Sequence, residues 1–281
     1  MLLTVPTNSR TWFTYFTSNG VVNLTNGELI KVTTVFQPQG VVLNTNANLS
    51  FGLFNSYAPQ ATRVTGNLPS SSSGAGYYQG YAFVVNFSTI FQTNNPNPTP
   101  IEIRVRTNLP DSDMLGTSSD YTPIGSGGST QGATGFTDGQ IFTNIFTVAN
   151  ASNGIVTISS QFTGSGGFNV FYSTNDILNT NDIAFDTFAI RPANNTTTAN
   201  DFIVTLVKVE TGIATNQTVA VAPIPINIAR SGGNVVLTWT NPVFNLYASP
   251  SVTNPFSLIS GATSGYTVPA SNGMRCFQLQ H

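Results

Sequence analysis

Apolar and polar residues alternate along short stretches of this chain. In residues 29–36, Ile30 and Val32 fall on one side of an extended backbone, and polar side chains fall on the other. A period of two residues is typical of a half-buried β-strand. The same pattern predicts further strands at 50–54, 80–88, 101–107, 141–148, 155–162, 186–190 and 201–210.

Connections rich in Gly, Ser, Asn and Pro separate these strands, and no ten-residue stretch has the apolar spacing of an amphipathic helix. We expect exposed loops at 70–74, 94–98 and 125–129. Many short strands without helices are typical of a sandwich or a barrel. The sequence therefore predicts an all-β fold.

The composition changes after residue 210, where a Thr-, Ala- and Asn-rich stretch leads into Pro223 and Pro225. Proline stiffens an extended chain and opposes strand pairing. We therefore place a boundary near residue 218, between a large domain at 1–218 and a small module at 219–281.

The small module repeats the alternating pattern. At 234–241, Val235, Leu237 and Trp239 share one side of a predicted strand, and Trp239 is expected to anchor the core. Further short strands are predicted at 246–249, 256–259, 266–268 and 275–279.

Charge is scarce in this chain. Only 7% of the 281 residues are charged, against about 25% in an ordinary soluble domain. The net charge of −2 and the absence of a basic cluster exclude nucleic acid as a partner. No apolar run approaches the roughly 18 residues of a membrane-spanning helix, so membrane insertion is not expected.

The residues needed for most catalytic sites are also scarce. The single histidine, His281, is the last residue, which rules out Ser-His-Asp and Cys-His arrangements and removes the usual zinc ligand. Glycosidases need two carboxylates held close together, and no two carboxylates alternate along a predicted strand. We expect a protein that is not an enzyme and that holds no cofactor.

Compartment has to be argued from composition, because one cysteine, Cys276, forms no internal disulfide. A neutral Thr/Asn/Ser surface with two lysines, Lys31 and Lys208, is typical of cell-surface and fibre proteins. Residues 1–6 lack the pattern of a signal peptide. We expect a secreted or cell-surface protein whose leader lies outside this sequence.

Short motifs follow one another in order through the large domain: WFTYF at 12–16, LTNGEL at 24–29, FGLFNS at 51–56, GY at 80–81, LG at 115–116, FDTF at 185–188 and DF at 201–202. On these motifs the first 200 residues or so resemble the LamG-like, concanavalin A-like jelly-roll domains of secreted bacterial proteins. The resemblance implies a two-sheet jelly-roll sandwich that binds or assembles, without implying catalysis.

A second series of motifs lies in the module: GNVVLTW at 233–239, LYAS at 246–249, GATS at 261–264 and RCFQL at 275–279. These motifs resemble the small C-terminal β modules appended to such proteins. The resemblance implies a compact C-terminal β-sandwich module.

Three aromatic residues, Tyr77, Tyr78 and Tyr81, surround a glycine, and Trp12 and Tyr15 lie nearer the N-terminus. Aromatic faces stack on sugars or anchor protein contacts. Most aromatics in a sandwich fill the core, and we favour the core interpretation over the ligand-binding one.

Glu102, Arg104 and Arg106 alternate along one predicted strand, opposite three apolar residues. We favour a solvated face with a weak ion ladder. The alternative is a polar stripe that binds a glycan or another subunit.

Several carboxylates could supply oxygen ligands to calcium. Asp176, Asp182 and Asp186 lie near one another in a stretch rich in Asn and Asp. A second group at 111–120 contains Asp111, Asp113 and Asp120. Asn and Asp also dominate turns, so calcium is an alternative to an ordinary turn-rich loop.

Two functions remain open. The first is a structural or adhesive protein that self-associates into a fibre or surface layer, with Leu2, Leu3 and Val5 as the apolar end that crosses between subunits. The second is a soluble glycan-binding module. We favour the first on the sequence alone.

Overall fold

The computed structural model describes residues 1–43, 45–64, 74–92, 100–110, 114–116, 118–129, 132–151, 155–176, 183–214, 226–239, 244–251, 254–270 and 275–280. Its residues separate into two compact units, Met1–Thr215 and Asn216–His281. Each unit consists of antiparallel β-sheets, so the all-β prediction is confirmed. The boundary expected near residue 218 lies outside the described residues and stays a prediction.

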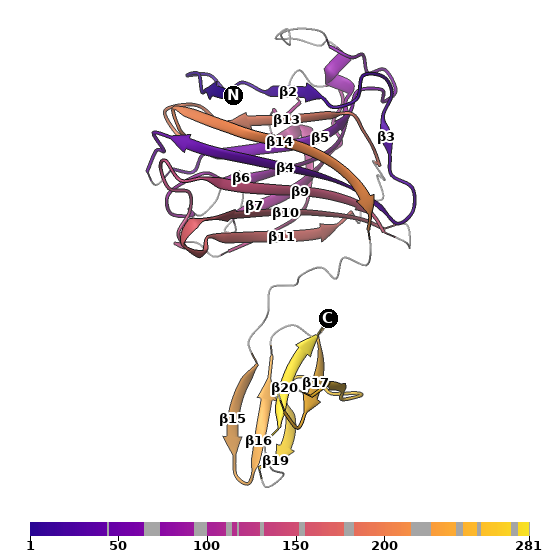
Figure 1. Ribbon diagram of the computed structural model, residues 1–281, viewed down its shortest axis with the longest axis vertical. Helices are drawn as coiled ribbons and strands as arrows, with labels where there is room; N and C mark the ends of the chain where they lie inside the picture. The colour runs from indigo at the N-terminus through magenta and orange to yellow at the C-terminus, as the bar shows by residue number, and fades with distance from the viewer. Residues whose placement is uncertain are drawn as a thin grey trace. The chain divides into compact units, whose positions relative to one another are not determined.

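The first unit is a sandwich of two six-stranded sheets (Figure 1). The first sheet has the order β1-β14-β4-β9-β10-β11. Its strands are β1 (Leu2–Thr4), β14 (Asp201–Ile213), β4 (Glu28–Gln39), β9 (Phe142–Asn150), β10 (Val156–Gly164) and β11 (Asn169–Asn175).

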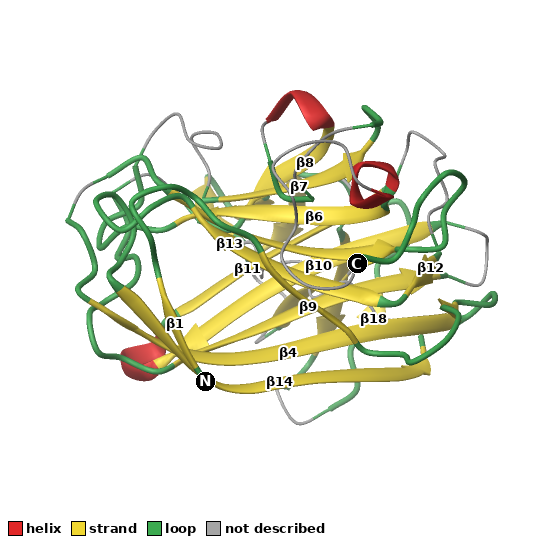
Figure 2. Ribbon diagram, turned by 90° about the horizontal axis from the view of Figure 1, so that it is seen from above, coloured by secondary structure: helices red, strands yellow, loops and turns green. Residues whose placement is uncertain are grey.

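The second sheet has the order β2-β13-β5-β6-β7-β8. Its strands are β2 (Trp12–Tyr15), β13 (Thr187–Pro192), β5 (Asn48–Asn55), β6 (Gln79–Asn86), β7 (Ile101–Arg106) and β8 (Tyr121–Gly127). A small sheet pairs β3 (Val22–Asn23) with β12 (Ala184–Phe185). Seen from above, β6, β7 and β8 form one layer, and β4 and β14 belong to the other (Figure 2).

Phenylalanine rings fill the space between the two sheets. The rings of Phe51 and Phe83, on neighbouring strands, stack with centroids 4.9 Å apart. Phe36, on the opposite sheet, is 2% exposed and contacts Phe51 and four other rings. The alternation found in the sequence thus sends one side of each strand into an aromatic core.

The predicted loop at 125–129 is wrong for its first three residues. Gly125, Ser126 and Gly127 belong to β8, which pairs with β7. A Cβ on Gly127 would lie 2.2 Å from the ring of Tyr172 on β11, and one on Gly125 would lie 2.3 Å from its hydroxyl. These glycines therefore serve close packing of one sheet on the other rather than a turn. The predicted loop at 94–98 lies outside the described residues, as does the predicted loop at 70–74 except for its last residue.

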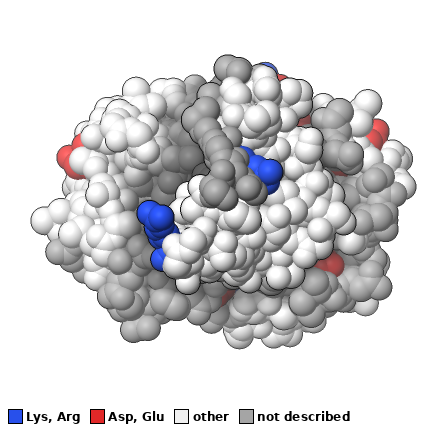
Figure 3. Space-filling view, turned by 90° about the horizontal axis from the view of Figure 1, so that it is seen from below, with Lys and Arg blue, Asp and Glu red and all other residues white. Residues whose placement is uncertain are grey.

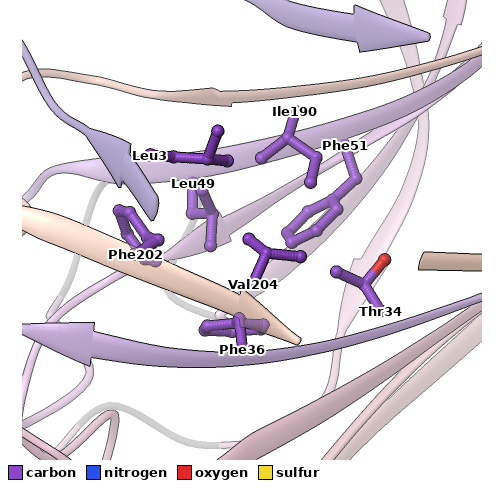
Figure 4. A pocket seen from close by; sticks show the side chains of 8 residues that line it. All are labelled: Leu3, Thr34, Phe36, Leu49, Phe51, Ile190, Phe202 and Val204. Carbon is purple, nitrogen blue, oxygen red and sulfur yellow. The ribbon is translucent and has the colours of Figure 1, made fainter. Parts of the chain in front are cut away.

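The N-terminal strand belongs to the sandwich of its own chain. Leu3 pairs with Phe202 on β14, and the terminal amino group donates to the carbonyl of Val204 (2.7 Å). Leu3 and Val5 are 6% and 1% exposed. The expected apolar contact surface is therefore wrong for these two side chains, although Leu2 is exposed. Figure 4 shows Leu3 beside a cavity of about 10 Å³, whose lining residues are Leu3, Thr34, Phe36, Leu49, Phe51, Ile190, Phe202 and Val204.

Loop segments cover part of the outer face of the second sheet. Residues 56–64, 74–78, 114–116 and 118–120, which we call the covering loops, contribute Tyr78, Met114 and Leu115 to a second apolar cluster. From the sheet, Phe54 and Ala82 join that cluster. The rest of this outer face carries the site described below.

The second unit contains two three-stranded sheets, β15-β16-β19 and β18-β17-β20. The strands are β15 (Asn227–Ser231), β16 (Asn234–Thr238), β19 (Tyr266–Pro269), β18 (Ser257–Leu258), β17 (Asn245–Ser249) and β20 (Cys276–Gln280). Trp239 is 5% exposed and packs with Leu237 and Leu246, which confirms it as a core residue.

Charged side chains are few on the face shown in Figure 3, as the composition predicts. None of the helices in the described ranges is long and apolar enough to cross a bilayer.

Candidate ligand-binding hollow

A polar hollow of about 210 Å³ opens on the outer face of the second sheet. It is lined by Ser9, Asn48, Ser50, Val84, Arg104, Gly116, Arg191 and Ala193. Segments far apart in the chain supply these residues: the connection after β1, strands β5 to β7, a covering loop and the end of β13. We call this feature the hollow.

Strand alternation points the lining residues away from the core. Ser50 lies between the buried residues Leu49 and Phe51, so its side chain faces outward. Ser50 pairs with Arg191 on one side and with Val84 on the other. The base of the hollow is therefore built on regular, hydrogen-bonded strands, which hold its side chains in fixed positions.

One wall contains an ion pair on β7. The Nε of Arg104 donates a hydrogen bond to the carboxylate of Glu102, and the two side chains are 12% and 4% exposed. Two residues apart on one strand, the two side chains share the outer face. This contact holds the guanidinium of Arg104 at the hollow.

The opposite wall contains Arg191. Its Nη1 donates to the carbonyl of Gly116 in a covering loop (3.2 Å). The neighbouring Leu115 is buried above Gly52, where an added Cβ would lie 3.1 Å from the leucine side chain. This loop therefore closes one side of the hollow and links Arg191 to the covering segment.

The alternation of Glu102, Arg104 and Arg106 on the outer face is confirmed, but the expected solvated face is wrong. Arg106 is 2% exposed, and its Nη1 donates to the carbonyls of Ala75 (2.9 Å) and Tyr78 (3.0 Å). A covering loop lies on this end of β7 and excludes solvent. Arg106 therefore anchors that loop, and Arg104 is the residue of the three that lines the hollow.

The three tyrosines do not form a ligand-binding surface. Tyr78 and Tyr81 are fully buried, and Tyr77 is half-buried. Tyr81 points into the sandwich, where its hydroxyl donates to Asp176 (2.7 Å). The core interpretation is therefore correct for Tyr78 and Tyr81, and the ligand-binding interpretation of these two side chains is wrong.

Tyr78 holds a covering loop on the sheet. Its hydroxyl lies 2.7 Å from the hydroxyl of Tyr15 and donates to the carbonyl of Thr62 (3.2 Å). Burial, followed by the hydrogen bond with Tyr15, raises the pKa of Tyr78 well above that of a free phenol. The phenol therefore stays protonated in the folded protein.

The carboxylates considered for calcium have other roles in the structure. Asp186 is fully buried, accepts from the backbone N–H of Ser56 (2.8 Å) and forms an ion pair with Arg63 (3.3 Å). Asp176 accepts from Tyr81. Asp182 lies outside the described residues, and no group of three or more His, Cys, Asp and Glu gathers within the described ranges.

Asp176 and Asp186 thus have different hydrogen-bond partners, and the calcium site expected on them stays a prediction. In the second candidate group, Asp111 and Asp113 lie outside the described residues, and Asp120 is buried. His281 also lies outside the described residues.

Sequence reasoning missed four of the polar residues that line the hollow: Ser9, Asn48, Ser50 and Arg191. None of these four residues lies within one of the motifs identified in the sequence. The available signal is that Ser50 and Arg191 interrupt apolar strands at outward positions. The sequence alone could not show that Ser50 and Arg191 are neighbours, because they are far apart in the chain and meet only where β5 pairs with β13.

No protein-family model matches the sequence, and no curated protein sequence matches it. Solved structures do match. The carbohydrate recognition domain of Emp47p is 13% identical, with a TM-score of 0.41, and the match covers 75% of this chain and 82% of that one. The lectin UEA-II, solved in complex with galactose, is 13% identical, with a TM-score of 0.42 and coverage of 75% and 87%.

A third match is the PL-14 alginate lyase from Aplysia kurodai, which is 12% identical with a TM-score of 0.37, covering 68% of this chain and 72% of that one. Because these TM-scores are below 0.5, the ligand of this chain has to be inferred from its own residues.

Proposed function

We propose that the first unit is a non-enzymatic, saccharide-binding domain and that the hollow is its binding site. The observation that supports this proposal is the gathering of hydroxyl, amide and guanidinium groups around one opening of about 210 Å³. Sugars present both donors and acceptors. The hydroxyl of Ser50 and the amide of Asn48 can donate and accept, and the guanidinium of Arg191 can donate.

The size of the hollow limits the ligand to a small unit. Pockets for drug-sized molecules span about 300 to 1,000 Å³, and the hollow, at about 210 Å³, is smaller. One ring of an oligosaccharide suits this volume, with the other rings outside it. A rigid sheet that holds the polar groups in place lowers the entropic cost of binding.

The function favoured on the sequence alone, self-association through the N-terminus, lost its main support. Leu3 and Val5 are buried in their own sandwich and offer no surface to another subunit. We propose instead that the protein works outside the cell as a soluble module that binds polysaccharides. Its low content of charged residues, 7%, is typical of cell-surface proteins and supports this location.

A blocking substitution tests the site. Ser50→Tyr places a large side chain at the base of the hollow without entering the core, because Ser50 faces outward. Ser159→Tyr on β10 is the matched control, since Ser159 is an outward-facing, half-buried serine of the other sheet. Both proteins and the unmodified one are applied to an array of neutral and acidic glycans.

The expected result is binding that Ser50→Tyr abolishes and Ser159→Tyr leaves unchanged, with all three proteins melting at similar temperatures. Binding that survives Ser50→Tyr would move the site away from the hollow. A protein that binds no glycan on the array would overturn the proposed function.

A further inference from the structure

The hollow is bordered by two arginines from opposite sides. Arg191 is on β13 and Arg104 is on β7, and strands β5 and β6 lie between them. Three strand spacings of about 4.8 Å place the two backbones about 14 Å apart. Both side chains line the hollow, so a ligand seated on Ser50 and Val84 lies between two guanidinium groups.

Positive charge is scarce in this chain. The whole sequence has nine Lys and Arg residues in 281, and two of them line one hollow. Glu102 neutralises one charge through its contact with Arg104, which leaves a net positive charge among these three side chains. A neutral sugar would not require that charge, whereas an anionic one would be stabilised by it.

The ion pair also sets the geometry of recognition. Because Glu102 contacts the Nε of Arg104, the far end of that planar guanidinium is directed away from the carboxylate. A guanidinium presents parallel N–H donors that match the two oxygens of a carboxylate. Beside the guanidinium groups, the hydroxyl of Ser50 and the amide of Asn48 can form hydrogen bonds with the hydroxyl groups of the sugar ring.

We infer that the hollow recognises an acidic sugar, whose carboxylate binds to the arginine pair Arg104 and Arg191. This inference rests on the proposed saccharide-binding function and names the class of its ligand. The carboxylate supplies the specificity, and Ser50 and Asn48 orient the ring.

The test compares ligands that differ in the carboxylate alone. Oligomers of galacturonate, glucuronate-containing hyaluronan and alginate are titrated into the full chain by calorimetry, each beside its carboxyl-reduced counterpart. At least one acidic oligomer should bind about tenfold or more tightly than its reduced form, the ratio expected for losing one charged hydrogen-bonded contact. Its affinity should also fall as salt is raised.

Variants assign the effect to the two arginines. Arg191→Gln and Arg104→Gln should each weaken binding of the acidic oligomer about tenfold, and should weaken binding of the reduced oligomer by a clearly smaller factor. Arg191→Lys keeps the charge but loses the parallel donors, so it should retain part of the affinity. Lys208→Gln is the matched control, because it removes one positive charge from the exposed end of β14 in the same unit. Thermal melting verifies that each variant is folded.

The outcomes separate the two proposals. Equal affinity for acidic and reduced oligomers would overturn the acidic-sugar inference and leave saccharide binding in place. Equal loss in Arg191→Gln and Lys208→Gln would show a diffuse charge effect and would also overturn the inference. Failure of every neutral and acidic glycan to bind would overturn both proposals.

Discussion

The guanidinium of Arg63 lies 3.3 Å from the buried carboxylate of Asp186. Arg63 also lies over the ring of Tyr15, 4.0 Å from its centroid. The same carboxylate accepts hydrogen bonds from the backbone N–H of Ser56 (2.8 Å) and from the hydroxyl of Thr187 (2.9 Å). One aspartate thus fixes both ends of the covering loop 56–64 to the start of β13.

Removing that carboxylate should destabilise the first unit strongly. Asp186→Ala leaves Arg63 without its ion-pair partner and the donors of Ser56 without their acceptor, and breaking a buried ion pair in this way costs about 3 to 5 kcal/mol of unfolding free energy. Urea denaturation followed by fluorescence measures the loss. Asp201→Ala, at a half-buried aspartate on β14, is the control and should change stability much less. Similar losses in the two variants would contradict the anchoring role of Asp186.

Close packing of Tyr172 on Gly127 should also be measurable. Gly127→Ala places a Cβ 2.2 Å from the tyrosine ring, and overpacking of this kind costs about 1 to 3 kcal/mol. In a Tyr172→Ala background the obstacle is gone, so adding Gly127→Ala should cost much less. A double-mutant cycle from chemical denaturation gives the coupling. If the losses of unfolding free energy caused by Gly127→Ala and Tyr172→Ala were additive, the glycine would be needed for a reason other than contact with Tyr172.

The sequence predicted the central strands well and the edge strands poorly. Strand β4 has a buried residue at nearly every second position, and this period is visible in the sequence. Strand β8 contains a proline, and its glycines face Tyr172 on the other sheet. Those residue types indicate a loop locally, and the partner that makes the glycines suitable for a strand lies in a distant part of the chain.

The site was less predictable than the fold for a related reason. The alternation of Glu102, Arg104 and Arg106 was readable, but the burial of Arg106 depends on a covering loop elsewhere in the sequence. Arg104 and Arg191 come together only because β7 and β13 belong to one sheet. A local pattern gives the face on which a side chain lies, and the strand order decides which side chains share that face.

Alkaline pH should weaken the first unit through Tyr78. Its pKa in the folded protein is raised by burial, whereas a tyrosine in the unfolded chain titrates near pH 10. The folded state therefore holds this proton more tightly, and the resulting stability is complete below about pH 10 and is lost as pH rises above it. Tyr78→Phe should lower stability at neutral pH by about 0.5 to 1.5 kcal/mol for each hydrogen bond lost.

The decisive comparison is the slope of stability against pH. Above about pH 10 the unmodified protein should lose unfolding free energy more steeply than Tyr78→Phe, because the phenylalanine has no proton to release. Between about pH 7 and 9 the difference between the two proteins should stay constant. Parallel curves across the whole range would show that Tyr78 does not titrate on unfolding.

Trp239 should dominate the stability of the second unit. It is 5% exposed in a core with Leu237, Phe244, Leu246 and Val268, so Trp239→Ala should cost about 3 to 5 kcal/mol. Its ring N–H is buried and has no hydrogen-bond partner among the described residues. Trp239→Phe removes that unsatisfied donor and should therefore cost much less than Trp239→Ala. Calorimetric melting tests this order, and equal costs for the two variants would contradict it.

The N-terminal strand gives the last prediction. Leu3 is 6% exposed and Leu2 is 61% exposed, so Leu3→Ala should cost about 2 to 5 kcal/mol, while Leu2→Ala should change stability by less than about 0.5 kcal/mol. Sedimentation should give the same oligomeric state for both variants and for the unmodified protein, because β1 pairs with β14 of its own chain. Deleting residues 1–5 removes that pairing and should lower the melting temperature. If the deletion instead dissolved an oligomer without loss of stability, the strand would have to be exchanged between copies, and self-association through the N-terminus would regain its support.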